Sequence, residues 1–140
     1  MKPIEAPKLV DYVAGAAFSN SLAWLTLSLT SFFEIEGIAL QQLLFASYFL
    51  GAIVAGYLVS RKALEEHLKV GLKTGIGAFV FHAYVFMGVF ELLWGRRFLY
   101  LADHLLVLTI LLAGSFVGSL LCRQFPLRKL GTTNSKKIVS

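Results

Sequence analysis

Two polar residues lie near the centres of long apolar segments, where they could take part in proton or ligand binding. His82 falls in the middle of residues 70–94, and Asn20 falls in the middle of residues 11–33. An imidazole can bind and release a proton, and a carboxamide can donate and accept hydrogen bonds. An ionisable group at membrane depth is costly when it faces lipid. We therefore expect both side chains to face the interior of the protein.

Two interpretations of Asn20 and His82 remain open. One is a ligand or proton site, because transporters built from repeats bind their substrates near the membrane midplane. The other is a neutral histidine that holds helices together through a hydrogen bond worth about 1 kcal/mol. The partners considered for that hydrogen bond are Asn20, Ser19, Ser47 and Tyr84.

A second group of ionisable residues surrounds the junction between the third and fourth apolar segments. Its members are Glu91, Arg96, Arg97, Asp103 and His104. We expect an ionic cluster at the outer membrane surface, with substrate selection and metal binding as the alternatives. The sequence has no His-x-x-x-His or Glu-x-x-His pattern that would support a metal site, so we predict none.

The sequence lacks the motifs of soluble catalysis. It has no G-x-S-x-G element, no phosphate-binding loop, no dinucleotide fingerprint and no cysteine–histidine nucleophile pair. Its single cysteine, Cys122, excludes an internal disulfide. We predict a protein without enzymatic activity and without a cofactor, and regard an intramembrane enzyme as the least favoured class.

The elements that must position these residues follow from composition. Hydrophobic residues make up 57% of the 140 residues and charged residues 15%, whereas soluble domains have about 25% charged residues. A membrane-spanning helix needs about 20 apolar residues. Four segments have that length: about 11–33, 38–60, 70–94 and 98–122. The expected fold is an all-α integral membrane four-helix bundle over residues 1–123, followed by a flexible basic tail over residues 124–140.

The distribution of lysine and arginine predicts the orientation of this bundle. With four spans, eleven of the thirteen basic residues fall on the side of the two termini and of the segment 61–69. Cytoplasmic loops carry such an excess of positive charge. The sequence therefore predicts a multi-pass cell-membrane protein with both termini in the cytoplasm. Its net charge of +5 is explained by topology, and no nucleic-acid partner is expected.

The charged segment Arg61–Lys69 joins the second and third apolar segments. It contains good helix formers and no glycine or proline. We expect a solvated helical elbow. A docking face for a cytoplasmic protein and a contact with anionic lipid are the alternatives.

An internal repeat is suggested by a shift of 62 residues. This shift places Gly56 on Gly118, Arg61 on Arg123, and Asn20 on His82. Two copies of a helical hairpin would share one orientation and would be related by a pseudo-two-fold axis along the membrane normal. We therefore expect two tandem hairpins.

Small residues at four-residue spacing provide candidate faces for close helix packing. They are Gly51, Ala55 and Gly56 in the second segment, Gly71 and Gly75 in the third, and Gly114 and Gly118, a G-x-x-x-G pair, in the fourth. In lipid, close backbone contact supplies much of the energy of helix association. These faces could pack inside one bundle or between protomers.

The elbow and its flanking glycines also carry a family resemblance. The pattern Gly51-Ala-x-x-Ala-Gly56-Tyr57, then Arg61-Lys62, then Gly71-Leu72-x-x-Gly75 resembles a group of uncharacterised four-span membrane proteins of bacteria and archaea. That resemblance implies the fold and no activity. The function we expect is an accessory subunit of a larger membrane complex, or a scaffold that self-associates through small-residue faces. The alternative is a small homo-oligomeric transporter or channel with a midplane site at Asn20 and His82.

Overall fold

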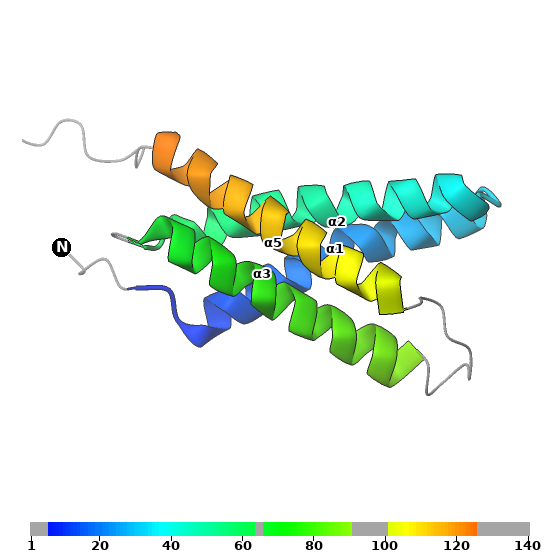
Figure 1. The fold of residues 1–140 in the computed structure, drawn as a ribbon, viewed down its shortest axis with the longest axis horizontal. Helices are drawn as coiled ribbons and strands as arrows, with labels where there is room; N and C mark the ends of the chain where they lie inside the picture. Colours follow the sequence, from blue (N-terminus) through cyan, green and yellow to red (C-terminus); the bar gives the residue numbers. More distant parts are fainter. Residues whose placement is uncertain (1–5, 64–65, 91–100, 126–140) are drawn as a thin grey trace, which may run out of the picture.

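The computed structural model describes residues 6–63, 66–90 and 101–125. These residues form four α-helices and one π-helical segment: α1 (Leu9–Phe32), α2 (Gly37–Ser60), α3 (His67–Ala83), η1 (Tyr84–Phe90) and α5 (Leu101–Gln124) (Figure 1). No strand occurs among them, so the all-α prediction is confirmed for this part of the chain. Residues 126–140 of the expected tail and three members of the predicted ionic cluster, Glu91, Arg96 and Arg97, lie outside the described residues.

The helix ends follow from local chemistry. The chain enters α1 directly after Pro7 and Lys8, and the Lys8 backbone N–H donates to Asp11 Oδ2 at 2.8 Å. This side-chain acceptor satisfies a backbone group that has no helical partner at the start of α1. The turn between α1 and α2 contains Glu34 at φ 54°, and α2 begins with Gly37 at φ 67°. Such left-handed conformations reverse the chain within a few residues.

The helices alternate in direction and pack pairwise. Figure 1 shows α2 and α5 running side by side, with α1 against α2 and α3 against α5. Two hydrogen bonds define the two ends of the bundle. Tyr57 Oη donates to the Phe125 carbonyl where α2 and α5 end, and Gln41 Nε2 donates to Asp103 Oδ1 at 3.2 Å where both begin.

Glycines permit the helices to approach closely. A Cβ atom added to Gly56 would collide with the backbone of Ser115, and one added to Gly118 would collide with the backbone of Ile53. A Cβ atom at Gly51 would lie 2.5 Å from the Ser19 carbonyl oxygen. The contacts at Gly71, Gly75 and Gly114 are also with other helices of the same chain, and Ala55 is fully buried.

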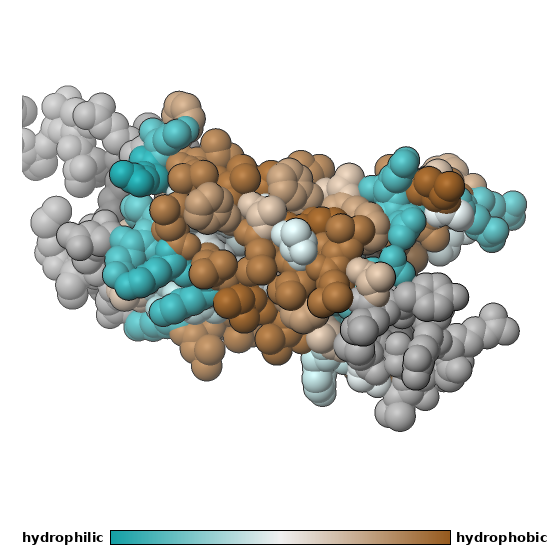
Figure 2. All heavy atoms as spheres, in the orientation of Figure 1, coloured by the Kyte–Doolittle hydropathy of each residue, from teal (hydrophilic) through white to brown (hydrophobic). Residues whose placement is uncertain are grey.

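The outside of the bundle is largely apolar. Figure 2 shows hydrophobic residues over the middle of the molecule and hydrophilic residues gathered towards its two ends. Exposed apolar side chains come from every α-helix and include Leu29, Leu50, Val54, Leu72, Ile76, Val80 and Leu105. By length and composition, α2 and α5 could each cross a membrane.

Candidate functional site

The site is a chain of three hydrogen-bonding side chains inside the bundle. His82 on α3 places Nδ1 2.9 Å from Tyr48 Oη on α2, and it places Nε2 3.2 Å from His104 Nδ1 on α5. The exposed fractions are 2% for Tyr48, 0% for His82 and 4% for His104. Three helices therefore meet through one buried polar chain, which we call the histidine chain.

Aromatic contacts fix the position of the His82 ring. The Tyr48 ring meets it edge-on with centroids 5.2 Å apart, and Phe79 stacks against it at 6.1 Å and 28°. The helix changes to the π form at Tyr84, two residues after His82. π-helical turns are rare and often occur at functional sites.

Two tautomeric arrangements satisfy both contacts of the histidine chain without a net charge. In the first, Tyr48 donates to His82 Nδ1, and His82 Nε2–H donates to His104 Nδ1. In the second, His104 Nδ1–H donates to His82 Nε2, and His82 Nδ1–H donates to Tyr48 Oη. Hydroxyl and imidazole groups allow both directions because each can donate and accept.

The far end of the histidine chain carries an unused polar atom. His104 Nε2 is buried and has no hydrogen-bond partner among the described residues. It is a donor in the first tautomeric arrangement and an acceptor in the second. A buried polar group without a partner is destabilising by about 1–3 kcal/mol. Within the histidine chain, His104 Nε2 is therefore the atom that could bind a proton or a hydrogen-bonding ligand.

Asn20 belongs to a neighbouring contact and does not hydrogen-bond to His82 in the structure. Its Nδ2 donates to the Ala16 carbonyl at 2.8 Å and to the Ala78 carbonyl at 3.1 Å, which links α1 to α3. Ala78 lies one helical turn before His82. The Asn20 Oδ1 atom is buried and has no partner among the described residues.

The other partners considered for His82 are engaged elsewhere or point away. Ser47 Oγ lies 2.6 Å from Thr26 Oγ1, and Ser19 Oγ donates to the Ala16 carbonyl at 2.9 Å. Tyr84 is 73% exposed. Tyr48 and His104, the described residues that hydrogen-bond to the imidazole nitrogens, are not among the partners expected from the sequence.

His104 is the main difference from the expected ionic cluster. The structure buries it against His82, while Asp103 is half-buried and accepts a hydrogen bond from Gln41. A signal for this burial was present in the sequence. His104 shares a helix face with Val107, Leu111 and Ser115, which are fully buried, and that spacing is the three- and four-residue period of one helix face.

Metal binding finds no support in the described part of the chain. No group of three or more histidine, cysteine or acidic side chains is close enough there to hold a metal ion.

Comparisons with known proteins do not assign a function. No protein-family model, curated protein or solved structure matches this chain. The function is therefore argued from the geometry alone.

Proposed function

We propose that this chain is an integral membrane protein whose spans are α1, α2, α3 continued by η1, and α5. The apolar exterior in Figure 2 supports this proposal. Within the most apolar 18-residue stretch of α2, only 44% is buried inside the protein. The corresponding stretch of α5 is 39% buried. A core helix of a soluble protein would be mostly buried. Contiguous apolar surface of this extent is what a lipid environment accommodates.

We call the end of the bundle that contains the segment Arg61–Lys69 the elbow end. The proposed orientation places this end in the cytoplasm. Six described basic residues belong to that end: Lys8, Arg61, Lys62, Lys69, Lys73 and Arg123. Lys62 forms an ion pair with Asp11, which ties the end of α2 to the start of α1. Positive charge accumulates on the cytoplasmic side of membrane proteins. The opposite end carries the acidic residues Glu34 and Glu36.

Reciprocal contacts support the proposed hairpin duplication. Gly56 packs on Ser115, and Gly118 packs on Ile53. A shift of 62 residues relates Ile53 to Ser115 and Gly56 to Gly118. The same shift therefore converts one contact into the other. Ala52 and Gly114, also 62 residues apart, lie against each other beside these contacts, towards the start of both helices. Such reciprocity is what a pseudo-two-fold axis between α2 and α5 would produce.

The function we propose is that of a non-enzymatic subunit or scaffold in a membrane assembly. The observation that carries it is an exposed face of α3 formed by Leu72, Ile76 and Val80, with the half-buried Gly77 beside it. A Cβ atom added to Gly77 would meet nothing within 4 Å. The glycines on the α2–α5 contact are used inside the bundle, whereas Gly77 leaves room for a second helix to approach. Small residues at helix interfaces permit that approach in lipid.

Purification from native membranes in a mild detergent tests this function. The expected result is a stable oligomer or a stoichiometric partner with the wild-type chain. Gly77→Phe should abolish the association because its side chain fills the open space on α3. The matched control is Val54→Phe on the exposed side of α2, which should keep the partner. A monomer without partners for the wild-type chain would contradict the proposal.

A second candidate, a small homo-oligomeric proton carrier, is favoured by the histidine chain. A proton arriving at His104 Nε2 releases the Nδ1 proton of that ring to His82 Nε2. His82 then passes its Nδ1 proton to Tyr48 Oη, whose own hydroxyl proton would leave to a water molecule that reaches the other end of the histidine chain. One proton has entered and one has left, so the three residues carry the same number of protons as before. The histidine chain has changed from the second tautomeric arrangement to the first.

Proton flux into reconstituted vesicles decides between the two candidates. A carrier should acidify the vesicle interior under an imposed pH gradient, and His104→Gln should stop this. Ser21→Ala is the control, since Ser21 is exposed and bonds only within α1 among the described residues. Vesicles that show no flux with the wild-type protein would eliminate the carrier and leave the subunit function.

A further inference from the structure

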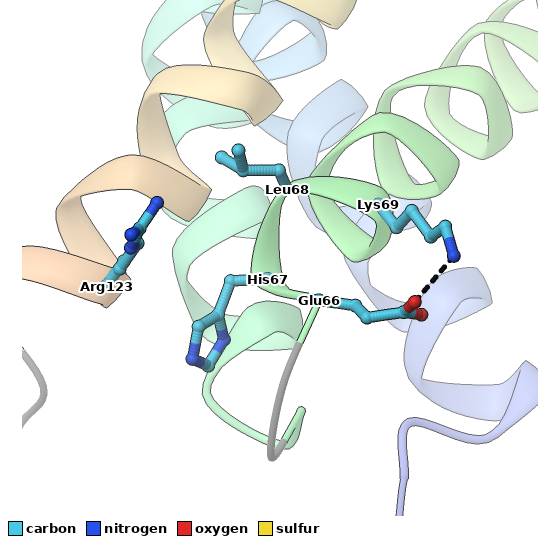
Figure 3. Close-up of a pocket in the computed structure, with 5 residues that line it drawn as sticks. All are labelled: Glu66, His67, Leu68, Lys69 and Arg123. Carbon is cyan, nitrogen blue, oxygen red and sulfur yellow. Dashed lines mark hydrogen bonds and ion pairs between the residues drawn. The ribbon is translucent and has the colours of Figure 1, made fainter.

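The elbow end contains a groove between the start of α3 and the end of α5. Glu66, His67, Leu68, Lys69 and Arg123 line it, and its volume is about 350 Å³ (Figure 3). Arg123 reaches it from α5, while the other four residues form the first turn of α3 and its cap. The groove is separate from the histidine chain and lies at the opposite end of α5 from His104.

The His67 ring is held in place at this groove. Its Nδ1 lies 2.9 Å from the Ser60 carbonyl oxygen, and Ser60 Oγ donates to the His67 carbonyl at 3.3 Å. The carbonyl can only accept, so Nδ1 carries the hydrogen in this contact.

The acidic residue of the groove is already compensated. Lys69 Nζ lies 2.5 Å from Glu66 Oε1, and this ammonium group lowers the pKa of the Glu66 carboxyl. Figure 3 shows this pair on one side of the first turn of α3, with His67 and Arg123 towards the other. No described carboxylate forms an ion pair with Arg123. The side of the groove near Arg123 therefore carries a positive charge that no carboxylate among the described residues offsets.

Backbone donors add to this charge. Glu66 caps α3 at φ 58° without a side-chain hydrogen bond to the helix. The first N–H groups of an α-helix have no partner within the helix. Here they face the same end of the bundle as the Arg123 guanidinium, which can bind two phosphate oxygens at once.

We propose that this groove binds a phosphate group, and that the phosphate belongs to an anionic phospholipid of the cytoplasmic leaflet. The lipid source rests on the proposed membrane orientation. Leu68 gives the groove an apolar wall on which the glycerol and upper acyl chain of a lipid could rest. Basic residues beside membrane-spanning helices attract anionic headgroups. Free phosphate shares the headgroup chemistry but would gain nothing from Leu68.

The test measures the thermal unfolding of the purified protein in an uncharged detergent. Three probes are added separately: short-chain phosphatidylglycerol, short-chain phosphatidylcholine and inorganic phosphate. The expected result is a concentration-dependent rise in Tm with phosphatidylglycerol and a much smaller rise with the other two. Arg123→Gln should weaken the apparent affinity about tenfold, and Arg123→Lys should restore part of it.

The control is Lys73→Gln, which removes one positive charge from the same end but does not line the groove. An equal loss of affinity in both glutamine variants would show diffuse charge attraction and would overturn the proposal. Equal responses to inorganic phosphate and phosphatidylglycerol would overturn the lipid assignment and leave a phosphate site. No response to either would overturn the site itself. The Tm measurement uses the purified protein and needs no protein partner. Failure of the phosphate site and failure of the proposed subunit function can therefore be told apart.

Discussion

His82 Nε2 lies 3.2 Å from His104 Nδ1, and this contact connects α3 to α5 across 22 residues of chain. Tyr48 extends the contact to α2 through the other nitrogen of the same ring. Buried polar groups are generally hydrogen-bonded within the protein, and three of the four nitrogens of this imidazole pair have such a partner among the described residues. The histidine chain therefore couples the relative positions of three helices.

Removing the Tyr48 hydroxyl should destabilise the bundle. Tyr48→Phe keeps the ring contacts but leaves His82 Nδ1 without this hydrogen-bond partner, which should lower the free energy of unfolding by about 1–2 kcal/mol. The measurement is a titration with a denaturing detergent followed by circular dichroism. Tyr84→Phe is the matched control, and it should have no effect because Tyr84 is 73% exposed. Equal effects of the two variants would contradict the buried role of Tyr48.

Glycines in the α2–α5 contact should not tolerate a methyl group. Gly118→Ala forces its Cβ into the backbone of Ile53, so we expect a loss of about 1–3 kcal/mol or failure to assemble. Gly56→Ala should behave alike, because its contact with Ser115 is the reciprocal one. Gly77→Ala has open space and should be neutral or stabilising by up to about 1 kcal/mol. Equal tolerance at residues 118 and 77 in the same unfolding measurement would argue against the close approach.

Asn20 should act as a link between α1 and α3. Asn20→Leu removes the hydrogen bond to the Ala78 carbonyl and should cost about 1 kcal/mol of stability. Proton flux in the vesicle measurement should be retained if the histidine chain is the conducting element. Intact stability with lost flux would instead assign Asn20 to a ligand site together with His82.

Much of the secondary structure was predictable from the sequence because the apolar runs are long and end at charged or glycine residues. The run expected at residues 38–60 is α2 (Gly37–Ser60), and the run expected at residues 98–122 includes most of α5 (Leu101–Gln124). The π-helical segment after Ala83 was not predicted. A π-helix differs from an α-helix in the spacing of its backbone hydrogen bonds. An uninterrupted apolar sequence does not reveal that difference.

The partners of His82 were harder to predict for a physical reason. A helix that is apolar on every side carries little information about which side faces inward, because lipid and protein interior favour the same residues. Small and polar residues carry that information instead. On α5, His104 precedes the buried Ser115 and Ser119 on one face. That face identifies His104 as an interior residue, whereas its position beside Asp103 suggested the surface.

The proposed four-span topology is tested by labelling single cysteines with a membrane-impermeant maleimide. Cys122→Ser provides the background, and one new cysteine is placed at Glu36 or at Lys69, which are both exposed. Glu36→Cys should react in intact cells, and Lys69→Cys should react only after the membrane is opened. Recovery of the chain as a soluble protein, or labelling of both positions from the same side, would contradict a bundle that spans the membrane with its elbow in the cytoplasm.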